Sequence, residues 1–381
     1  MSTMAILQAL ESDLSQSLQY ENTKDEAATK VTEYFIAQKG VEPSDTQMLH
    51  HFLQKFYSKT GIDTSNLSSY SKNFLKEAFY ESISAGLFAR YRQQTVDANS
   101  AFAKANLIAT HLNKAFMTDY FGFAVALDAD PLQKKLKAEK CYELTNQTLT
   151  GNKDQGVAMI GAGLDLAIEI GDEKRRLDFL SKCQYVLYEM ESLQHVAMSL
   201  GHYLLAGTAT YETLRAWTQF HIGNIWLDFQ NATAAKDEFE GAMDWALADG
   251  FDYAVMTLSE RLGLANMRLG KLSLAEKNYE DSRTRAKSDQ IKPEQAMKNE
   301  VRCLIGLGNL YYRKAETQSG DQRDTTCIDA DQIFKQAVNL TNQVTYPTNK
   351  RVAFVNLSEL YKMWKGPGDP DVNNFLELAN Q

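Results

Sequence analysis

Side chains with catalytic or metal-binding chemistry are scattered along this sequence. His195 and His202 are seven residues apart, and a helix would place them on one face, but no third ligand lies near them in the sequence. Zinc takes three or four protein ligands. Acidic pairs such as Glu238 and Glu240 are expected on a solvated helix surface, whereas a catalytic carboxylate needs burial and a partner. These residues therefore predict no metal site, no cofactor and no catalytic group.

Short catalytic motifs are also missing. The sequence contains no GxxxxGKS/T phosphate loop, no GxSxG nucleophile elbow, no HExxH zinc motif and no CxxC pair. The Gly-Ala-Gly at residues 161–163 falls inside a predicted helix, so it does not indicate nucleotide binding. The four cysteines have no paired spacing and are expected to be free thiols in a reducing compartment. We expect no enzyme activity; an active site within residues 1–130 is kept as an alternative.

The charge balance disfavours nucleic acid as a partner. The chain has 40 Lys and Arg against 49 Asp and Glu, a net charge of -9, whereas phosphate contact needs clustered basic residues. The longest strongly apolar run, residues 121–127, is far shorter than the roughly 20 residues of a membrane span. No targeting segment is visible, so we expect a cytoplasmic protein without membrane contact.

Proline placement and apolar spacing predict helices throughout. All six prolines lie between apolar-periodic segments, and a proline inside a helix costs about 3 kcal/mol. Ile6, Leu10 and Leu14 fall on one helical stripe, and Asp172 followed by Glu173 marks a helix start. No alternating run with turn signals indicates a strand, so we predict an all-α fold.

Small and aromatic residues recur with a period of about 40 residues. Two consecutive units have a small, an aromatic and a small residue at 12, 16 and 19 positions after a glycine. In the first unit these are Ala235, Phe239 and Ala242 after Gly223, and in the second they are Ala275, Tyr279 and Ser282 after Gly263. A third unit, from Gly308, has Ala330, Phe334 and Ala337 after a polar insert, ETQSGDQRDTTC, which we interpret as an exposed loop. Small residues allow two helices to approach closely, and large ones fill the space between pairs that cannot bury their apolar faces alone.

At these residues the chain resembles the tetratricopeptide repeat (TPR) superfamily. The stretch RLGLANMRLGKLSLAEKNYEDS carries the family's small–large–small signature, and residues 307–311 match its Leu-Gly-x-x-Tyr. The resemblance is clearest over residues 215–342 and departs from the family at Asn266, where an aromatic residue is usual. The long period is similar to that of kinesin light chains and of the bacterial Rap phosphatases with their peptide-pheromone-receptor relatives.

The resemblance implies a domain organisation. About six helix pairs in a right-handed superhelix are expected over residues 131–381, after an N-terminal helical module over residues 1–130. That module shows no repeat phase. Its sequence predicts helices near residues 3–20, 24–40, 44–60, 68–97 and 98–127. Its aromatic residues Tyr120, Phe121 and Phe123 are expected to pack where the module meets the repeats. Both a capping role and a surface for a second partner remain open for this module.

The resemblance also implies a concave groove, lined by the first helix of each pair, that holds a peptide. Carried over by repeat phase, the predicted groove residues are Trp217, Phe220, Asn224, Asp228, Glu260, Arg268, Arg302, Asn309 and Arg313. Asparagine amides donate to and accept from a peptide backbone, and arginine pairs with carboxylate or phosphate. The alternative is structural: the asparagines satisfy internal hydrogen bonds, and the arginines pair with Glu260 or Asp228.

The function that the resemblance implies is recognition of a peptide or protein segment by an intracellular adaptor or regulator that is not an enzyme. The alternative is a peptide-controlled bacterial signalling regulator of the Rap type, whose N-terminal module acts on a second protein. Repeat arrays need polar caps. We therefore expect Phe375, Leu376 and Leu378, in the last helix, to meet another subunit or to lie under the N-terminal module.

Overall fold

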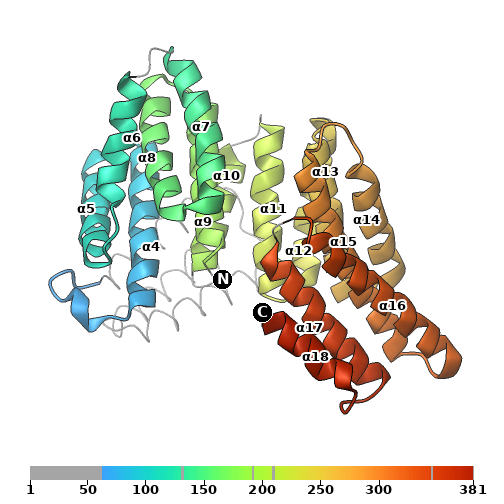
Figure 1. The fold of residues 1–381 in the computed structure, drawn as a ribbon. Coiled ribbons are helices and arrows are strands. Elements are labelled where there is room, and N and C mark those ends of the chain that lie inside the picture. Colours follow the sequence, from blue (N-terminus) through green and yellow to red (C-terminus); the bar gives the residue numbers. More distant parts are fainter. Residues whose placement is uncertain (1–61, 130–132, 191–192, 208–210, 345, 381) are drawn as a thin grey trace, which may run out of the picture. The chain divides into compact units, whose positions relative to one another are not determined.

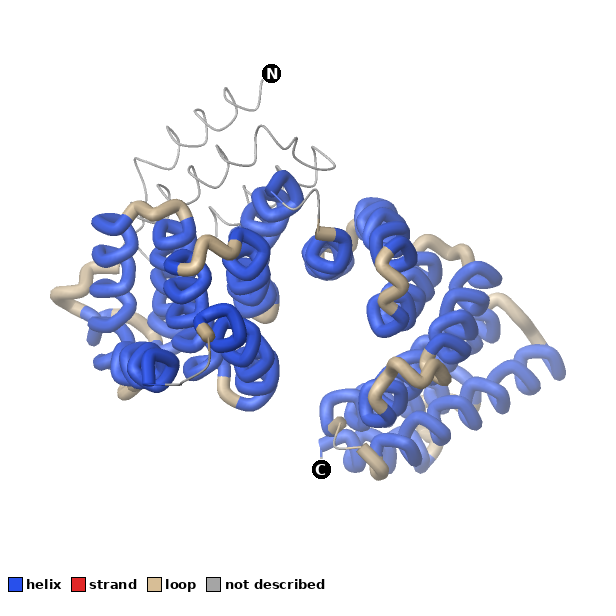
Figure 2. Tube along the Cα trace, turned by 90° about the horizontal axis from the view of Figure 1, so that it is seen from above, coloured by secondary structure: helices blue, strands red, loops and turns tan. Residues whose placement is uncertain are grey.

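The computed structural model describes residues 62–129, 133–190, 193–207, 211–344 and 346–380. Every regular element in these ranges is a helix, fifteen α-helices and one short 3-10 helix, η1 (Leu67–Ser69), which confirms the predicted all-α class. The same helices joined by loops are seen in Figure 2. The helices predicted near residues 3–20, 24–40 and 44–60 lie outside the described residues.

The described residues fall into two compact units, divided within α11 between Ile225 and Trp226. The first unit contains the helices α4 (Lys72–Tyr91), α5 (Thr95–His111), α6 (Phe116–Ala129), α7 (Lys134–Gly151), α8 (Lys153–Glu169), α9 (Glu173–Tyr188), α10 (Gln194–Gly207) and most of α11 (Glu212–Asp228) (Figure 1). The pairs α7–α8 and α9–α10 each pack together. Asp172 caps α9 by accepting a hydrogen bond from the Arg175 backbone N–H, at the predicted helix start.

Helices on both sides of residue 130 share the core of the first unit. Helix α4 packs against α8 and α9, and α6 packs against α8. Tyr120 on α6 lies against Gly161, and its hydroxyl donates to Asp165, which also pairs with Arg90 at 2.7 Å. Tyr120 therefore packs against α8, a helix that the predicted boundary assigns to the repeats. The boundary near residue 130, between the N-terminal module and the first repeat, stays a prediction.

The second unit is a stack of helix pairs. It comprises α12 (Ala232–Ala248), α13 (Asp252–Arg268), α14 (Leu272–Arg285), α15 (Pro293–Glu316), α16 (Gly320–Thr341), α17 (Pro347–Trp364) and α18 (Pro370–Asn380). Extensive contacts join α13 to α14, α15 to α16 and α17 to α18, and each pair also touches the next (Figure 1). This is a helical-repeat arrangement.

The glycine and aromatic positions of the repeat meet as predicted. A Cβ added at Gly263 would lie 2.7 Å from the Tyr279 ring, and one at Gly308 would overlap the Phe334 ring. Both rings are almost completely buried. The absence of a side chain at the glycine therefore allows the aromatic ring of the second helix to lie against the backbone of the first.

The polar insert after Gly308 is not the exposed loop that we predicted. Helix α15 continues to Glu316 and α16 begins at Gly320, so most of the insert lengthens α16. Cys327 is fully buried, and Arg323 donates to the Met363 carbonyl at the end of α17 at 2.6 Å. These contacts with the next pair stabilise the added helix turns, and polarity alone did not reveal them.

The last helix buries part of its apolar face within its own pair. Phe375 packs against Phe354 and Tyr361 of α17, with ring centres 6.4 and 5.2 Å away, and Leu378 joins the same cluster. Leu376 is 40% exposed. The predicted contact with another subunit or with the N-terminal module is therefore not needed to bury Phe375, and it stays a prediction for Leu376.

Candidate binding site on the first helices of the pairs

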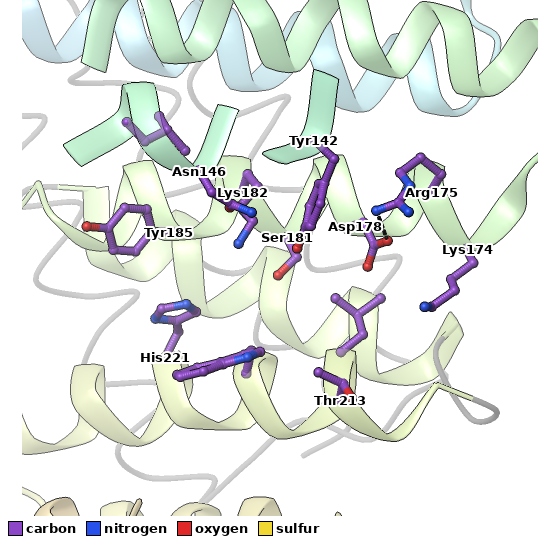
Figure 3. Close-up of a pocket in the computed structure, with 13 residues that line it drawn as sticks. Tyr142, Asn146, Lys174, Arg175, Asp178, Ser181, Lys182, Tyr185, Thr213 and His221 are labelled. Atoms are coloured by element: carbon purple, nitrogen blue, oxygen red, sulfur yellow. Dashed lines mark hydrogen bonds and ion pairs between the residues drawn. The ribbon is translucent and has the colours of Figure 1, made fainter. Parts of the chain in front are cut away.

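The first unit contains a cavity of about 380 Å³ whose walls come from α7, α9 and α11 alone (Figure 3). Helices α7 and α9 are the first helices of the packed pairs α7–α8 and α9–α10, and the sequence predicts that α11 begins the next pair. Its lining is Tyr142, Asn146, Leu149, Lys174, Arg175, Asp178, Ser181, Lys182, Tyr185, Thr213, Leu214, Trp217 and His221. Aromatic faces and charged groups thus share one cavity, on the helices to which the repeat assigns the groove.

One ion pair lies inside this cavity. Arg175 Nη1 donates to Asp178 Oδ2 at 3.1 Å, and the two side chains are 16% and 9% exposed. The Arg175 guanidinium also lies 4.7 Å from the centre of the Tyr142 ring. Burial raises the pKa of Asp178, against the opposing effect of Arg175 and two lysines. The Asp178 carboxylate is therefore stabilised chiefly by Arg175.

Lys182 stands apart from that pair. Its Nζ lies 5.1 Å from the centre of the Tyr142 ring, and no carboxylate in the described part of the chain lies within ion-pair distance of it. Burial lowers the pKa of Lys182 to about 8. At neutral pH the cavity therefore holds an ammonium group that is mostly charged, with an aromatic face as its neighbour.

His221 closes the cavity on the α11 side. Its ring packs against Tyr185 and Tyr188, with centres 5.5 and 5.7 Å apart. Burial lowers the pKa of His221 to about 3, and the charge of Lys182 acts in the same direction. Among the described residues, Nδ1 of His221 is buried without a hydrogen-bond partner. His221 is therefore a neutral aromatic wall at physiological pH.

Replacing Lys182 by methionine is expected to raise the free energy of unfolding by about 1–3 kcal/mol at pH 7, because burial penalises the ammonium group. Lys182 has a pKa of about 8 in the folded chain and an ordinary value of 10.5, so the unfolded chain binds more protons between these values. The gain in unfolding free energy should be constant below about pH 8, the pKa of Lys182 in the folded chain. It should shrink as the pH rises from there toward 10.5, the ordinary pKa of a lysine. Urea unfolding of both proteins across this range measures it; a gain independent of pH would contradict the assignment.

The structure places the predicted groove residues of α11 in different surroundings. Trp217 lines the cavity and packs edge-on to Phe220, with ring centres 5.3 Å apart. Asn224 is 3% exposed, and its Nδ2 donates to the Phe220 carbonyl at 3.0 Å, whereas Asp228 is exposed. The Asn224 amide therefore satisfies an internal hydrogen bond, as the structural alternative required. A ligand contact by any of the four stays a prediction.

The predicted residues of the second unit hold successive first helices together. Arg268 of α13 donates to the Leu227 carbonyl in the last turn of α11. Arg313 of α15 makes the same contact one repeat later, with Met267 of α13 at 3.2 Å. A guanidinium has five N–H donors, so these bonds leave donors for a ligand. Asn309, on the same face of α15 as Arg313, is half-buried.

Glu260 and Arg302 form a largely buried ion pair between α13 and α15. Arg302 Nε and Arg261 Nε lie 3.5 and 3.4 Å from Glu260 Oε2, and Glu260 is 6% exposed. Arg302 also donates to the Tyr346 hydroxyl at 3.2 Å. Burial acts to lower the pKa of Arg302, but Glu260 and Tyr346 outweigh it and raise that pKa above its ordinary value. The predicted pairing of a groove arginine with Glu260 is thus present.

The sequence interpretation missed the cavity residues Tyr142, Asp178 and Lys182. Asp178 and Lys182 are four residues apart, which is the spacing of an ordinary surface pair on a helix. Because the repeat phase is weak before residue 207, groove positions were not carried over to α7 and α9. The position of α7 and α9 as first helices of their pairs is the signal that could have indicated these cavity residues.

No protein-family model and no curated protein matches this sequence. Among solved structures, BtubC (BKLC) from P. vanneervenii aligns at 17% identity over 64% of this chain and 87% of that one, with a TM-score of 0.36. The signal transduction ATPase with numerous domains (STAND) that has a tetratricopeptide repeat sensor, from Pyrococcus horikoshii, aligns at 13% identity over 95% and 53%, with a TM-score of 0.44. The apo form of RapI aligns at 12% identity over 93% and 96%, with a TM-score of 0.41.

The chain is a helical-repeat protein. The stacked pairs of the second unit and the phase of their small and aromatic residues decide this assignment. Within the described ranges, no group of three or more His, Cys, Asp and Glu side chains is placed to hold a metal ion. The helices that the structure describes include none with the length and apolar character of a membrane span.

Proposed function

We propose that this chain is a TPR-like adaptor or regulator without enzymatic activity, which binds a peptide or protein segment on the first helices of its pairs. The observation that carries the proposal is the cavity lined by α7, α9 and α11 alone. Its volume of about 380 Å³ lies in the range of sites for small ligands. Aromatic walls and a few polar groups are the usual composition of such a site.

The second unit has an exposed face of its own on α17, the first helix of its last pair. On α17, Val352, Val355 and Glu359 are exposed, the two valines by 40% and 36%. They lie along one face because residues three and four apart are neighbours on a helix. In the proposed function this face, together with the predicted groove residues Arg268, Asn309 and Arg313, forms the binding surface of the second unit.

The proposal is tested by selecting octapeptides from a random displayed library on the full chain. Hydrogen exchange with and without an enriched peptide should show protection in α7, α9 and α11. Trp217→Ala, which removes one cavity wall, should weaken binding roughly 10-fold or more. Trp245→Ala is the matched control, because Trp245 is a half-buried tryptophan on the second helix α12. Failure to enrich any peptide, or protection of second helices only, would overturn the proposal.

The same complex separates the plain adaptor from the peptide-controlled regulator. A regulator must bind the peptide more tightly in one of two conformations, so its dimensions in solution should change on binding. A plain adaptor should keep one radius of gyration. Small-angle scattering of the free chain and of the complex distinguishes these outcomes.

A further inference from the structure

We propose that the cavity of the first unit recognises a carboxylate, and that Lys182 on α9 forms the ion pair with it. The inference rests on the proposed function for its ligand: the carboxylate belongs to the bound peptide, as an acidic side chain or as the C-terminus. The two sources share one chemistry, and the test below separates them.

The charge of the cavity is opposite to that of the chain. Its lining contains three cations, Lys174, Arg175 and Lys182, and a single carboxylate, Asp178. With His221 neutral, these groups sum to a charge of about +2 at pH 7, whereas the whole chain carries -9. Local positive charge in an acidic protein attracts an anionic group to this place.

Two of the three lining cations, Lys174 and Lys182, make no ion pair among the described residues, and Lys182 is the less exposed of the two. Asp178 is hydrogen-bonded to Arg175 at 3.1 Å, and the Lys182 amine has an aromatic ring, Tyr142, in place of a carboxylate. In Figure 3 the Lys182 amine and the Arg175–Asp178 pair flank Tyr142. A half-buried ammonium without a counter-ion is unfavourable, and a carboxylate brought by a ligand removes that penalty through a charge-assisted hydrogen bond.

The rest of the lining favours a carboxylate with an organic stem over a free dianion. Tyr142, Trp217 and the neutral His221 offer apolar faces for methylene groups, and Asn146 offers an amide for a backbone group. Asp178, on the same helix, would repel a phosphate dianion about twice as strongly as a carboxylate, because the dianion carries two negative charges and the carboxylate carries one. The charge of Arg175 is already paired with Asp178, which weakens its attraction for a dianion.

The test uses the full chain and a positional-scanning library of octapeptides with free or amidated C-termini. Wild type should select Asp or Glu at one position, or a free C-terminus. Changing that acid to its amide should weaken binding roughly 10- to 100-fold. In Lys182→Met the same change should have little effect, and Lys76→Met, an exposed lysine on α4, should behave like wild type. Circular dichroism verifies that each variant folds.

The outcomes separate this inference from the proposed function. Peptides that bind without preference for an acid, or that lose equal affinity on amidation in wild type and in Lys182→Met, overturn the carboxylate pocket and leave peptide binding intact. If no peptide binds, the proposed function fails, and 3-phenylpropionate then probes the cavity directly. The carboxylate pocket is supported if wild type binds 3-phenylpropionate but not its amide, and if Lys182→Met binds neither. It is overturned if wild type does not distinguish the acid from the amide, or if Lys182→Met binds the acid as well as wild type does.

Discussion

Replacing Phe334 by alanine is expected to lower the free energy of unfolding of the second unit by about 3–5 kcal/mol. The ring is fully buried on α16 and lies against the backbone of α15 at Gly308. It belongs to a cluster that includes Phe354 and Leu357 of the next pair, so its loss leaves a void between two pairs. Urea unfolding followed by circular dichroism measures the change.

The control for this prediction lies on the same helix. Ile328 of α16 is 43% exposed, and Ile328→Ala should change stability by no more than about 0.5 kcal/mol. Gly308→Ala should cost about 1–3 kcal/mol, because its methyl group overlaps the Phe334 ring. In a chain that already carries Phe334→Leu, the cost of Gly308→Ala should fall. Equal costs in both backgrounds would show that the ring does not press on Gly308.

Glu260→Gln is expected to destabilise the second unit by about 2–4 kcal/mol, because it leaves the guanidinium of Arg302 without its counter-ion in a largely buried place. Glu260 is 6% exposed and Arg302 is 20% exposed. The amide keeps the shape of the carboxylate, so the effect reports the charge rather than a cavity. Thermal and urea unfolding of the variant and of wild type provide the measurement.

Two further variants show that the effect comes from the buried pair. Glu240 pairs with Lys236 on the surface of α12, with side chains 52% and 19% exposed, and Glu240→Gln should cost about 0.5 kcal/mol or less. Arg302→Met combined with Glu260→Met should cost less than the sum of the single changes, because the two residues interact directly. Additive losses would mean that Glu260 and Arg302 stabilise the unit through separate partners.

Part of the fold was predictable because helix packing imposes a local rule. Gly263 faces Tyr279, 16 residues further on, and Gly223 and Phe239 have the same separation in the unit before, so the sequence shows the two positions in phase. The insert after Gly308 obeyed no such rule. Its residues are polar, and their helical state depends on contacts of Arg323 and Cys327 with neighbouring helices.

The candidate site was predictable only where the repeat phase was clear. The distance of Trp217 from Gly223 predicts a position on a first helix, and Trp217 lines the cavity. The same rule predicts a groove position for Asn224, but its amide donates to the Phe220 carbonyl. Phase assigns a residue to a helix face, whereas the rotamer and the nearest acceptor decide what its side chain binds.

The sequence by itself determined the all-α class, the period of the repeat and the helices that carry its first positions. All three follow from the spacing of residues along the chain, because the regular turn of a helix places residues of a given spacing on the same face. Only the tertiary structure decided that Asp178 pairs with Arg175 and that Lys182 lies beside Tyr142, a residue of another helix 40 positions away. Along α9 the spacing allows Asp178 to pair with Arg175 or with Lys182. Which pair forms, and which ring of another helix lies beside Lys182, depend on packing between helices, which that spacing does not specify.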